Sequence, residues 1–193
     1  MQCINHQNYC KEMMICMSEY TRVKRELKHK GSIVDFYSDT MELPNGKIVD
    51  WDFIQHKGAA AIVPVDSEGK ILMVRQYRNA IERDTLEIPA GGKNVDEDMK
   101  TCAIRELEEE TGYRAGNVEH LIDLYTTVAF CNEKIGIYYT TELIPSKQHL
   151  DEDEFVNVER YTLDELVEMI FKGQIKDAKT IAAIMSYKAK RNL

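Results

Sequence analysis

The sequence has little of what a membrane protein or a nucleic-acid-binding protein needs. In its 193 residues no apolar run approaches the roughly 18 residues that cross a bilayer. Lys and Arg number 25 against 33 Asp and Glu, a net charge of −8, so the cationic surplus that holds a phosphate backbone is missing. We expect neither a membrane nor a nucleic-acid partner. A small anionic substrate is still compatible with this charge, because a bound divalent cation reverses the local field.

The cysteines are not arranged as disulfide or zinc motifs require. The five cysteines are odd in number and none lies in a Cys-x-x-Cys pair, which argues against a disulfide framework and for the reducing cytoplasm. Cys3, Cys10 and Cys16 fit no common zinc spacing, and we interpret them as free thiols. The first twenty residues have too short an apolar stretch and too few basic residues for a signal peptide. We expect residues 1–16 to be a disordered leader.

What the sequence does contain is the pattern of a mixed α/β domain. Its 44% apolar residues suffice for a sizeable core. β-Branched, aromatic or apolar stretches predict strands at 32–42, 47–56, 59–65, 71–77, 86–88, 118–128, 134–143 and 155–161. The turn signal at 43–46 makes the first two a hairpin.

Three helices are predicted among these strands. The first is capped by Asp96 and stops at Gly112, the second opens with a capping box at 162–165, and the third is capped by Asp177. Helices that alternate irregularly with hairpin-like strands predict a mixed sheet packed between helices. The acidic run 151–154 is most simply a solvated loop, with substrate gating as the alternative.

The predicted first helix carries three glutamates on one face. Glu106, Glu109 and Glu110 are spaced i, i+3 and i+4, and no cation follows four residues after Glu106 or Glu109. A solvated charged face is one interpretation of this cluster. The other is a metal site, since carboxylate oxygens suit Mg²⁺ or Mn²⁺ and a substrate phosphate completes the shell. Such a site has the parts for pyrophosphate hydrolysis.

The segment 91–113, GGKNVDEDMKTCAIRELEEETGY, resembles the Nudix box, Gly-x5-Glu-x7-Arg-Glu-U-x-Glu-Glu-x-Gly-U, at every fixed position. The resemblance implies a Nudix α/β/α sandwich with a mixed sheet, preceded by a small N-terminal antiparallel sheet. It also implies an Mg²⁺-dependent hydrolase, with Mn²⁺ as the alternative ion. The metal ligands that it implies are Glu106, Glu109, Glu110 and the backbone carbonyl of Ala90. Arg105 is implied to orient carboxylates, and with Glu109 it is assigned to catalysis.

Outside the box, the resemblance covers about residues 30–190 and points to the ADP-ribose pyrophosphatase branch. The motifs that carry it are VRQYR at 74–78, LEIPAG at 86–91 and GQIKDAKT at 173–180. It implies that Arg78 and Glu87 bind substrate, Arg78 near the phosphates. Trp51 is implied to stack on the base. A surface arginine and a packed tryptophan are the alternatives.

The loop at 125–133 resembles the loop of this branch that follows the box. Glu133 is therefore implied as the base or metal-assisting carboxylate, with an exposed loop glutamate as the alternative. Thr127-Val128-Ala129 stands where the branch has Ser-Pro-Gly. This departure keeps other nucleotide sugars open as substrates.

These features together predict a cytoplasmic homodimer that hydrolyses the pyrophosphate bond of a nucleoside diphosphate sugar. ADP-ribose, giving AMP and ribose 5-phosphate, is the first choice. Residues 17–57 would form a hairpin region for dimerisation and substrate, and residues 58–193 the Nudix domain. UDP- or GDP-sugars, dinucleoside polyphosphates and a non-catalytic ligand-sensing module are the alternatives. The three retained glutamates argue against the module.

Overall fold

The computed structural model describes residues 19–150, 152 and 154–192, in two compact units divided between Phe53 and Ile54. The sequence places this division a few residues later, after residue 57. The leader predicted at 1–16 lies outside the described residues.

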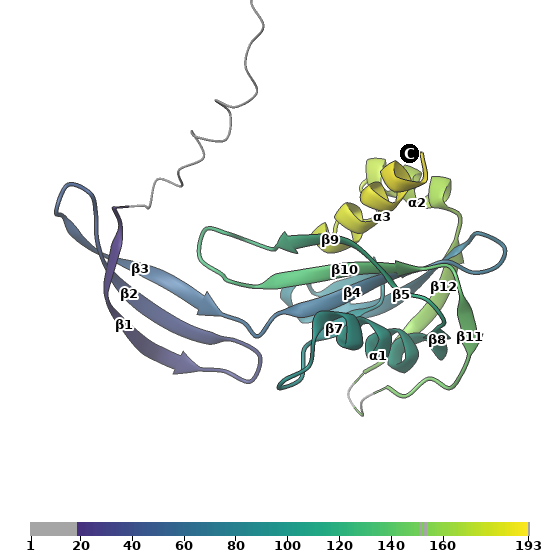
Figure 1. Cartoon of the computed structure of the whole chain (residues 1–193), viewed down its shortest axis with the longest axis horizontal. Helices are drawn as coiled ribbons and strands as arrows, with labels where there is room; N and C mark the ends of the chain where they lie inside the picture. Colours follow the sequence, from purple (N-terminus) through teal and green to yellow (C-terminus); the bar gives the residue numbers. More distant parts are fainter. Residues whose placement is uncertain (1–18, 151, 153, 193) are drawn as a thin grey trace, which may run out of the picture. The chain divides into compact units, whose positions relative to one another are not determined.

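The first unit is a three-stranded sheet in the order β1-β2-β3 (Figure 1). Its strands are β1 (Thr21–Lys30), β2 (Asp35–Glu42) and β3 (Ile48–Gln55). The predicted hairpin is confirmed as β2 and β3, with Gly46 in the left-handed conformation at the turn (φ 76°). The sequence did not predict β1, because TRVKRELKHK is charged at most positions and lacks the apolar alternation of a strand with one buried face.

The first unit has a polar centre in place of an apolar core. Of its described residues only Asp39 is buried, and Arg25 donates to it from Nε at 2.6 Å and Nη2 at 2.5 Å. The Arg25 guanidinium also lies 3.8 Å from the centre of the Phe53 ring. Large apolar side chains remain exposed: Tyr20, Val23, Leu27, Ile33, Val34, Ile48 and Trp51.

The second unit contains the mixed sheet. Four strands pair in the order β7-β4-β10-β9, where β10 runs parallel to β4 and antiparallel to β9. They are β4 (Ala59–Pro64), β7 (Ala90–Gly92), β9 (Glu119–Tyr125) and β10 (Lys134–Thr140). A second set pairs as β12-β5-β6: β5 (Ile71–Arg78), β6 (Arg83–Glu87) and β12 (Asn157–Tyr161). A short pair completes the strands: β8 (Tyr113–Ala115) and β11 (Leu143–Pro145).

Helices cover both faces of this sheet (Figure 1). They are α1 (Met99–Thr111), α2 (Leu163–Phe171) and α3 (Ala178–Arg191), and a 3-10 turn (Asn79–Ile81) follows β5. Alternate residues of β4 belong to different cores: Ile62 clusters with Leu107 of α1, whereas Val63 clusters with Leu166 of α2 and Ile184 of α3. This arrangement confirms the predicted α/β/α class. In the described part of the chain, no helix combines the length and apolar character needed to cross a membrane.

The predicted cap of α1 is wrong by two residues. Asp98, not Asp96, is the N-cap, and its Oδ1 accepts from the backbone N–H groups of Lys100 at 2.9 Å and Thr101 at 3.0 Å. Asp96 instead occupies a left-handed turn before the helix (φ 62°). The helix end at Gly112 is confirmed, as are the capping box at Thr162 and the Asp177 cap.

Candidate active site

Arg105 of α1 gathers three glutamates around one guanidinium. Its Nη1 donates to Glu106 Oε1 and Glu109 Oε2, both at 2.7 Å, and its Nε donates to Glu97 Oε1 at 2.9 Å. Arg105 thus contacts several carboxylates, and it lowers the pKa of Glu97 to about 2. The cluster does have a nearby cation, which lies four residues before Glu109 and not after it.

Glu106 and Glu110 are the buried members of the cluster. Glu110 Oε2 accepts from the backbone N–H of Ala90 at 3.0 Å. Burial, followed by the charge of Glu106, raises the pKa of Glu110 to about 8. Burial also raises the pKa of Glu106 to about 7, although Arg105 acts in the opposite direction. Ionising two neighbouring buried carboxylates is energetically unfavourable. A divalent cation bound between them would offset this cost.

Gly91 sets how closely β7 approaches Glu106. A Cβ at Gly91 would lie 2.1 Å from the carboxyl carbon of Glu106, whereas a Cβ at Gly92 would meet nothing within 4 Å. Only a residue without a side chain therefore leaves room for the Glu106 carboxylate at this point. The first glycine of the pair has a direct spatial role in the site.

The donor set around Glu106 fits a hard divalent cation. In the part of the chain that the structure describes, no three His, Cys, Asp or Glu side chains form a metal-ligand group by themselves. Mg²⁺ does not require one, since it usually keeps several waters and binds one or two carboxylates plus substrate phosphates. Glu106 and Glu110 would supply the carboxylates. Glu109, about one-third exposed, lies at the edge of the cluster.

A second ion cluster surrounds Glu87 at the end of β6. Arg78 donates to it from Nε and Nη2, both at 2.7 Å, and Thr85 Oγ1 donates at 2.5 Å. Lys179 Nζ donates to the second Glu87 oxygen and to Asp177 Oδ2 at 2.9 Å. Burial alone would raise the pKa of Glu87, but Arg78 and Lys179 outweigh it and lower the pKa to about 2. Glu87 is thus an ionised, buried anchor for two cations.

The two clusters lie within electrostatic reach of each other. The charge of Lys179 acts to lower the pKa of Glu110, and the charge of Glu110 acts to raise the pKa of Arg78. The structure thus brings the predicted Arg78 and Glu87 near the predicted metal ligands. Lys179 was not singled out from the sequence, although it lies inside the GQIKDAKT motif that was noted there.

Glu133 lies beside His56. Its Oε1 is 3.4 Å from His56 Nδ1, but that nitrogen accepts from the backbone N–H of Gly58 at 3.0 Å. A ring nitrogen that accepts in this way has no proton to donate to a carboxylate, so we do not count the contact as a hydrogen bond. Among the described residues, no hydrogen bond or ion pair joins Glu133 to α1.

Trp51 belongs to the first unit. There its ring is half exposed, with its centre 5.8 Å from that of Tyr20. A packed core tryptophan, the alternative interpretation of the sequence, does not describe it. Val128, which replaces the proline of the family pattern, is exposed in the second unit.

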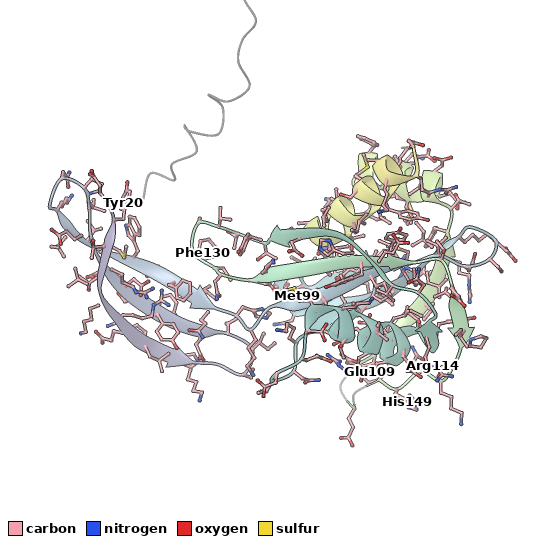
Figure 2. The ribbon with its side chains drawn as sticks, viewed as in Figure 1. Tyr20, Met99, Glu109, Arg114, Phe130 and His149 are labelled. Atoms are coloured by element: carbon pink, nitrogen blue, oxygen red, sulfur yellow. The ribbon has the colours of Figure 1, made fainter. Side chains whose placement is uncertain are left out.

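Glu154 is a carboxylate that the sequence interpretation left as a solvated loop residue. Its charge raises the pKa of both Glu106 and Glu110, which places it within electrostatic reach of the buried pair. The chain runs along α1 shortly before it, where the backbone N–H of His149 donates to Glu109 O at 2.9 Å (Figure 2). No sequence spacing could show this approach.

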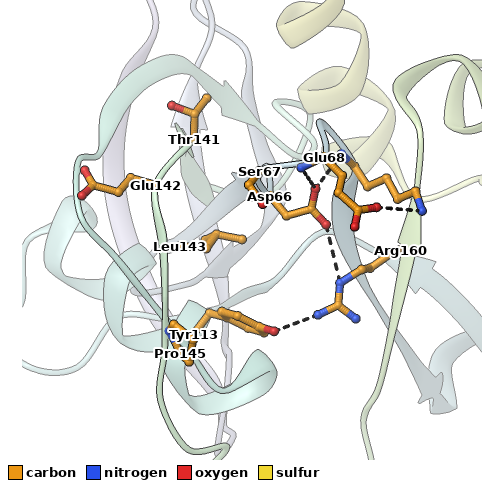
Figure 3. A pocket seen from close by; sticks show the side chains of 10 residues that line it. Asp66, Ser67, Glu68, Tyr113, Thr141, Glu142, Leu143, Pro145 and Arg160 are labelled. Atoms are coloured by element: carbon orange, nitrogen blue, oxygen red, sulfur yellow. Dashed lines mark hydrogen bonds and ion pairs between the residues drawn. The ribbon is translucent and has the colours of Figure 1, made fainter.

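A separate hollow of about 720 Å³ shares no residue with either cluster (Figure 3). Both of its cations pair with carboxylates of the lining: Arg160 lies 3.6 Å from Asp66 and also donates to Tyr113 Oη at 2.9 Å, and Lys70 lies 3.3 Å from Glu68. Glu142 is a third carboxylate of the lining, so the net charge of the hollow is −1, which is the wrong sign for an anionic substrate. The glutamate cluster remains the candidate active site.

Comparisons with known proteins agree on one family. The NUDIX domain family matches residues 55–184. An ADP-ribose pyrophosphatase of Bacillus subtilis is 38% identical over 182 residues, which are 93% of this chain and 98% of the relative. The methanol dehydrogenase activator of Bacillus methanolicus is 40% identical over 168 residues, 86% of this chain and 91% of the relative. A crystal structure of an ADP compounds hydrolase, at 21% identity, has a TM-score of 0.79 and shares the fold over 88% of this chain and 92% of that one.

Proposed function

The chain belongs to the Nudix family, and we propose that it uses Mg²⁺ to hydrolyse the pyrophosphate bond of a nucleoside diphosphate sugar. ADP-ribose is the substrate that we place first, and the addition of water would give AMP and ribose 5-phosphate. The observation that carries this proposal is the buried pair of Glu106 and Glu110, which is held against Ala90 and Gly91. The ADP-ribose pyrophosphatase at 38% identity supports the choice of substrate.

Nudix hydrolases generally use divalent metals. We assign Mg²⁺, with Mn²⁺ as the second choice, to Glu106, Glu110 and the carbonyl of Ala90, and Glu109 joins them when a further ion binds. When bound, the ion offsets the charge of the diphosphate and makes a water molecule a stronger nucleophile. Arg105 keeps the carboxylates in place through its bonds to Glu106 and Glu109.

Arg78 is suited to a phosphate oxygen of the substrate. Glu87 occupies its Nε and Nη2, and within the described residues Nη1 has no hydrogen-bond partner. A guanidinium held along one edge presents its remaining N–H groups in a fixed direction. Glu87 would then act on the substrate through Arg78, because both of its oxygens already have donors.

Two carboxylates are candidates for the group that positions the attacking water. Glu133 is the candidate from the sequence, and Glu154 is favoured by the reach of its charge to Glu106 and Glu110. The two are distinguished by Glu133→Gln and Glu154→Gln. The variant that removes the base should lower kcat by about 100-fold or more, and the other should retain most of the activity.

We also propose a cytoplasmic homodimer. The exposed apolar side chains of the first unit, together with the lack of an apolar core among its residues 19–53, support an interface there. In such a dimer Trp51 would be available to stack on the nucleobase.

A substrate panel tests the proposed reaction. ADP-ribose, UDP-glucose, GDP-mannose, NADH, diadenosine polyphosphates and coenzyme A are each incubated with Mg²⁺ or Mn²⁺, and the mononucleotide released is identified. We expect ADP-ribose to have the highest kcat/KM. No turnover of any member would overturn the proposal, and a clear preference for another sugar nucleotide would correct the substrate.

A second candidate function comes from the relative at 40% identity, whose name is methanol dehydrogenase activator. The test adds this chain to the methanol dehydrogenase of Bacillus methanolicus and follows methanol oxidation. An increase in rate that is absent with Glu110→Gln would show activation that depends on the glutamate cluster.

A further inference from the structure

We propose that Lys179 is a positioning residue for this reaction: with Asp177, it fixes the Glu87 carboxylate that holds Arg78 toward the substrate. The inference rests on the proposed function in one respect, namely that Arg78 binds a phosphate oxygen of the substrate. Its geometric part rests on the contacts of Lys179 itself.

Lys179 is held where α3 begins. Asp177, the N-cap of α3, accepts at Oδ2 from the backbone N–H of Thr180 at 3.0 Å and from its hydroxyl at 2.6 Å. The same oxygen accepts from Lys179 Nζ at 2.9 Å. The ammonium therefore has one anchor on its own helix and a second one, Glu87, on β6. Both side chains are shielded from water, with exposed fractions of 12% for Lys179 and 2% for Glu87.

A second bond joins the same two parts of the chain. The backbone N–H of Ile88, the residue after Glu87, donates to Thr180 Oγ1 at 3.1 Å. Adjacent residues of the β6 end are thus tied to adjacent residues of α3, over 92 positions of sequence. This double connection leaves Lys179 little freedom relative to Glu87.

The bonds to Glu87 explain why Lys179 would matter for Arg78. Arg78 binds both carboxylate oxygens in parallel, so the direction of its guanidinium follows the plane of the carboxylate. The four charges of Arg78, Lys179, Glu87 and Asp177 balance. Without Lys179, nothing on α3 holds the Glu87 carboxylate, so the carboxylate and the guanidinium bonded to it can both turn away from the orientation that reaches a phosphate.

A double-mutant cycle tests this link. Lys179→Met and Arg78→Gln should each lower kcat/KM for ADP-ribose by about tenfold or more, mainly through KM. If Lys179 acts through Arg78, the double variant should stay within about twofold of Arg78→Gln. Effects that multiply would overturn the proposal. Lys188→Met, which removes another lysine of α3, should leave both constants unchanged, and Lys179→Gln replaces the methionine variant if that one does not fold.

Hydrogen exchange separates this inference from the proposed reaction. If the wild-type chain turns over no nucleotide sugar, the proposed function fails, but the position of Arg78 is still measurable. By NMR, the Nε–H of Arg78 should exchange with water at least about tenfold faster in Lys179→Met than in the wild type or Lys188→Met. Equal exchange rates in all three would overturn the positioning role.

Discussion

At the scale of single residues, the site depends on how closely β7 approaches α1. Gly91 lets the backbone pass beside the Glu106 carboxylate, and the next peptide unit back donates to Glu110 through the N–H of Ala90. A side chain at Gly91 would displace Glu106, because its Cβ would lie only 2.1 Å from the carboxyl carbon of Glu106.

Gly91→Ala is therefore expected to lower activity at least about tenfold by displacing a metal-binding carboxylate. It should also lower the free energy of unfolding by about 1–3 kcal/mol, as overpacking does. Gly92→Ala is the matched control, since its Cβ would meet nothing within 4 Å. Steady-state kinetics and urea unfolding of both variants check the prediction, and equal behaviour of the two would contradict it.

Glu87 gives a pH-dependent prediction. Its pKa of about 2 in the folded chain lies below the roughly 4.3 of an unfolded glutamate, so folding favours its ionised form. This contribution, up to about 3 kcal/mol, is present above pH 4.3 or so and is lost as the pH falls toward 2. The stability gap between the wild type and Glu87→Gln should therefore narrow below about pH 4.

Denaturant unfolding between neutral and acid pH measures this gap. Glu168→Gln, which removes an exposed carboxylate from α2, is the control and should show a gap near zero throughout. A gap for Glu87→Gln that stays constant with pH would contradict the assigned ion cluster.

Residues close together in sequence were the ones that the sequence could place. Glu106, Glu109 and Glu110 share a face because helical spacing requires it. The pair of Glu87 and Lys179 could not be derived in this way, because their side chains meet only after β6 and α3 have packed. The electrostatic effect of Glu154 on Glu110 likewise depends on tertiary packing.

At the scale of elements, the start of α1 shows what composition leaves undecided. Asp96 and Asp98 are both acceptable caps by residue type, and the structure selects Asp98 by its bonds to two backbone N–H groups. Asp98→Ala should lower the free energy of unfolding by about 1 kcal/mol. Asp96→Gly should leave it unchanged or raise it slightly, since glycine adopts the left-handed conformation more readily. Thermal or urea unfolding of the two variants checks this prediction. A larger loss of stability in Asp96→Gly than in Asp98→Ala would indicate that Asp96 is the cap.

Elements with strong local signals were predicted, and those without them were missed. Capping residues located the starts of α2 and α3, and Gly112 located the end of α1. β1 was missed because both of its faces are largely exposed, which removes the alternation that identifies a strand. Pairing with β2, rather than its own sequence pattern, defines it.

At the scale of the whole molecule, the proposed dimer follows from the exposed apolar residues of the first unit. Light scattering at micromolar concentration should give twice the mass of one chain. The double substitution Val23→Asp and Leu27→Asp should shift the population to monomer, since it would bury two charges in the interface. Val128→Asp makes the same kind of change at an exposed valine of the second unit and should remain dimeric. A monomeric wild type would remove the shared-interface proposal.

The central claim, that the glutamates of α1 support hydrolysis of a pyrophosphate bond, is tested most directly by one comparison. ADP-ribose and Mg²⁺ are incubated with the wild-type chain and with Glu110→Gln, and the formation of AMP and ribose 5-phosphate is followed. We predict both products from the wild type, and a rate at least about 100-fold lower from a variant that remains folded. Equal rates from the two proteins, or no products from the wild type, would contradict the claim.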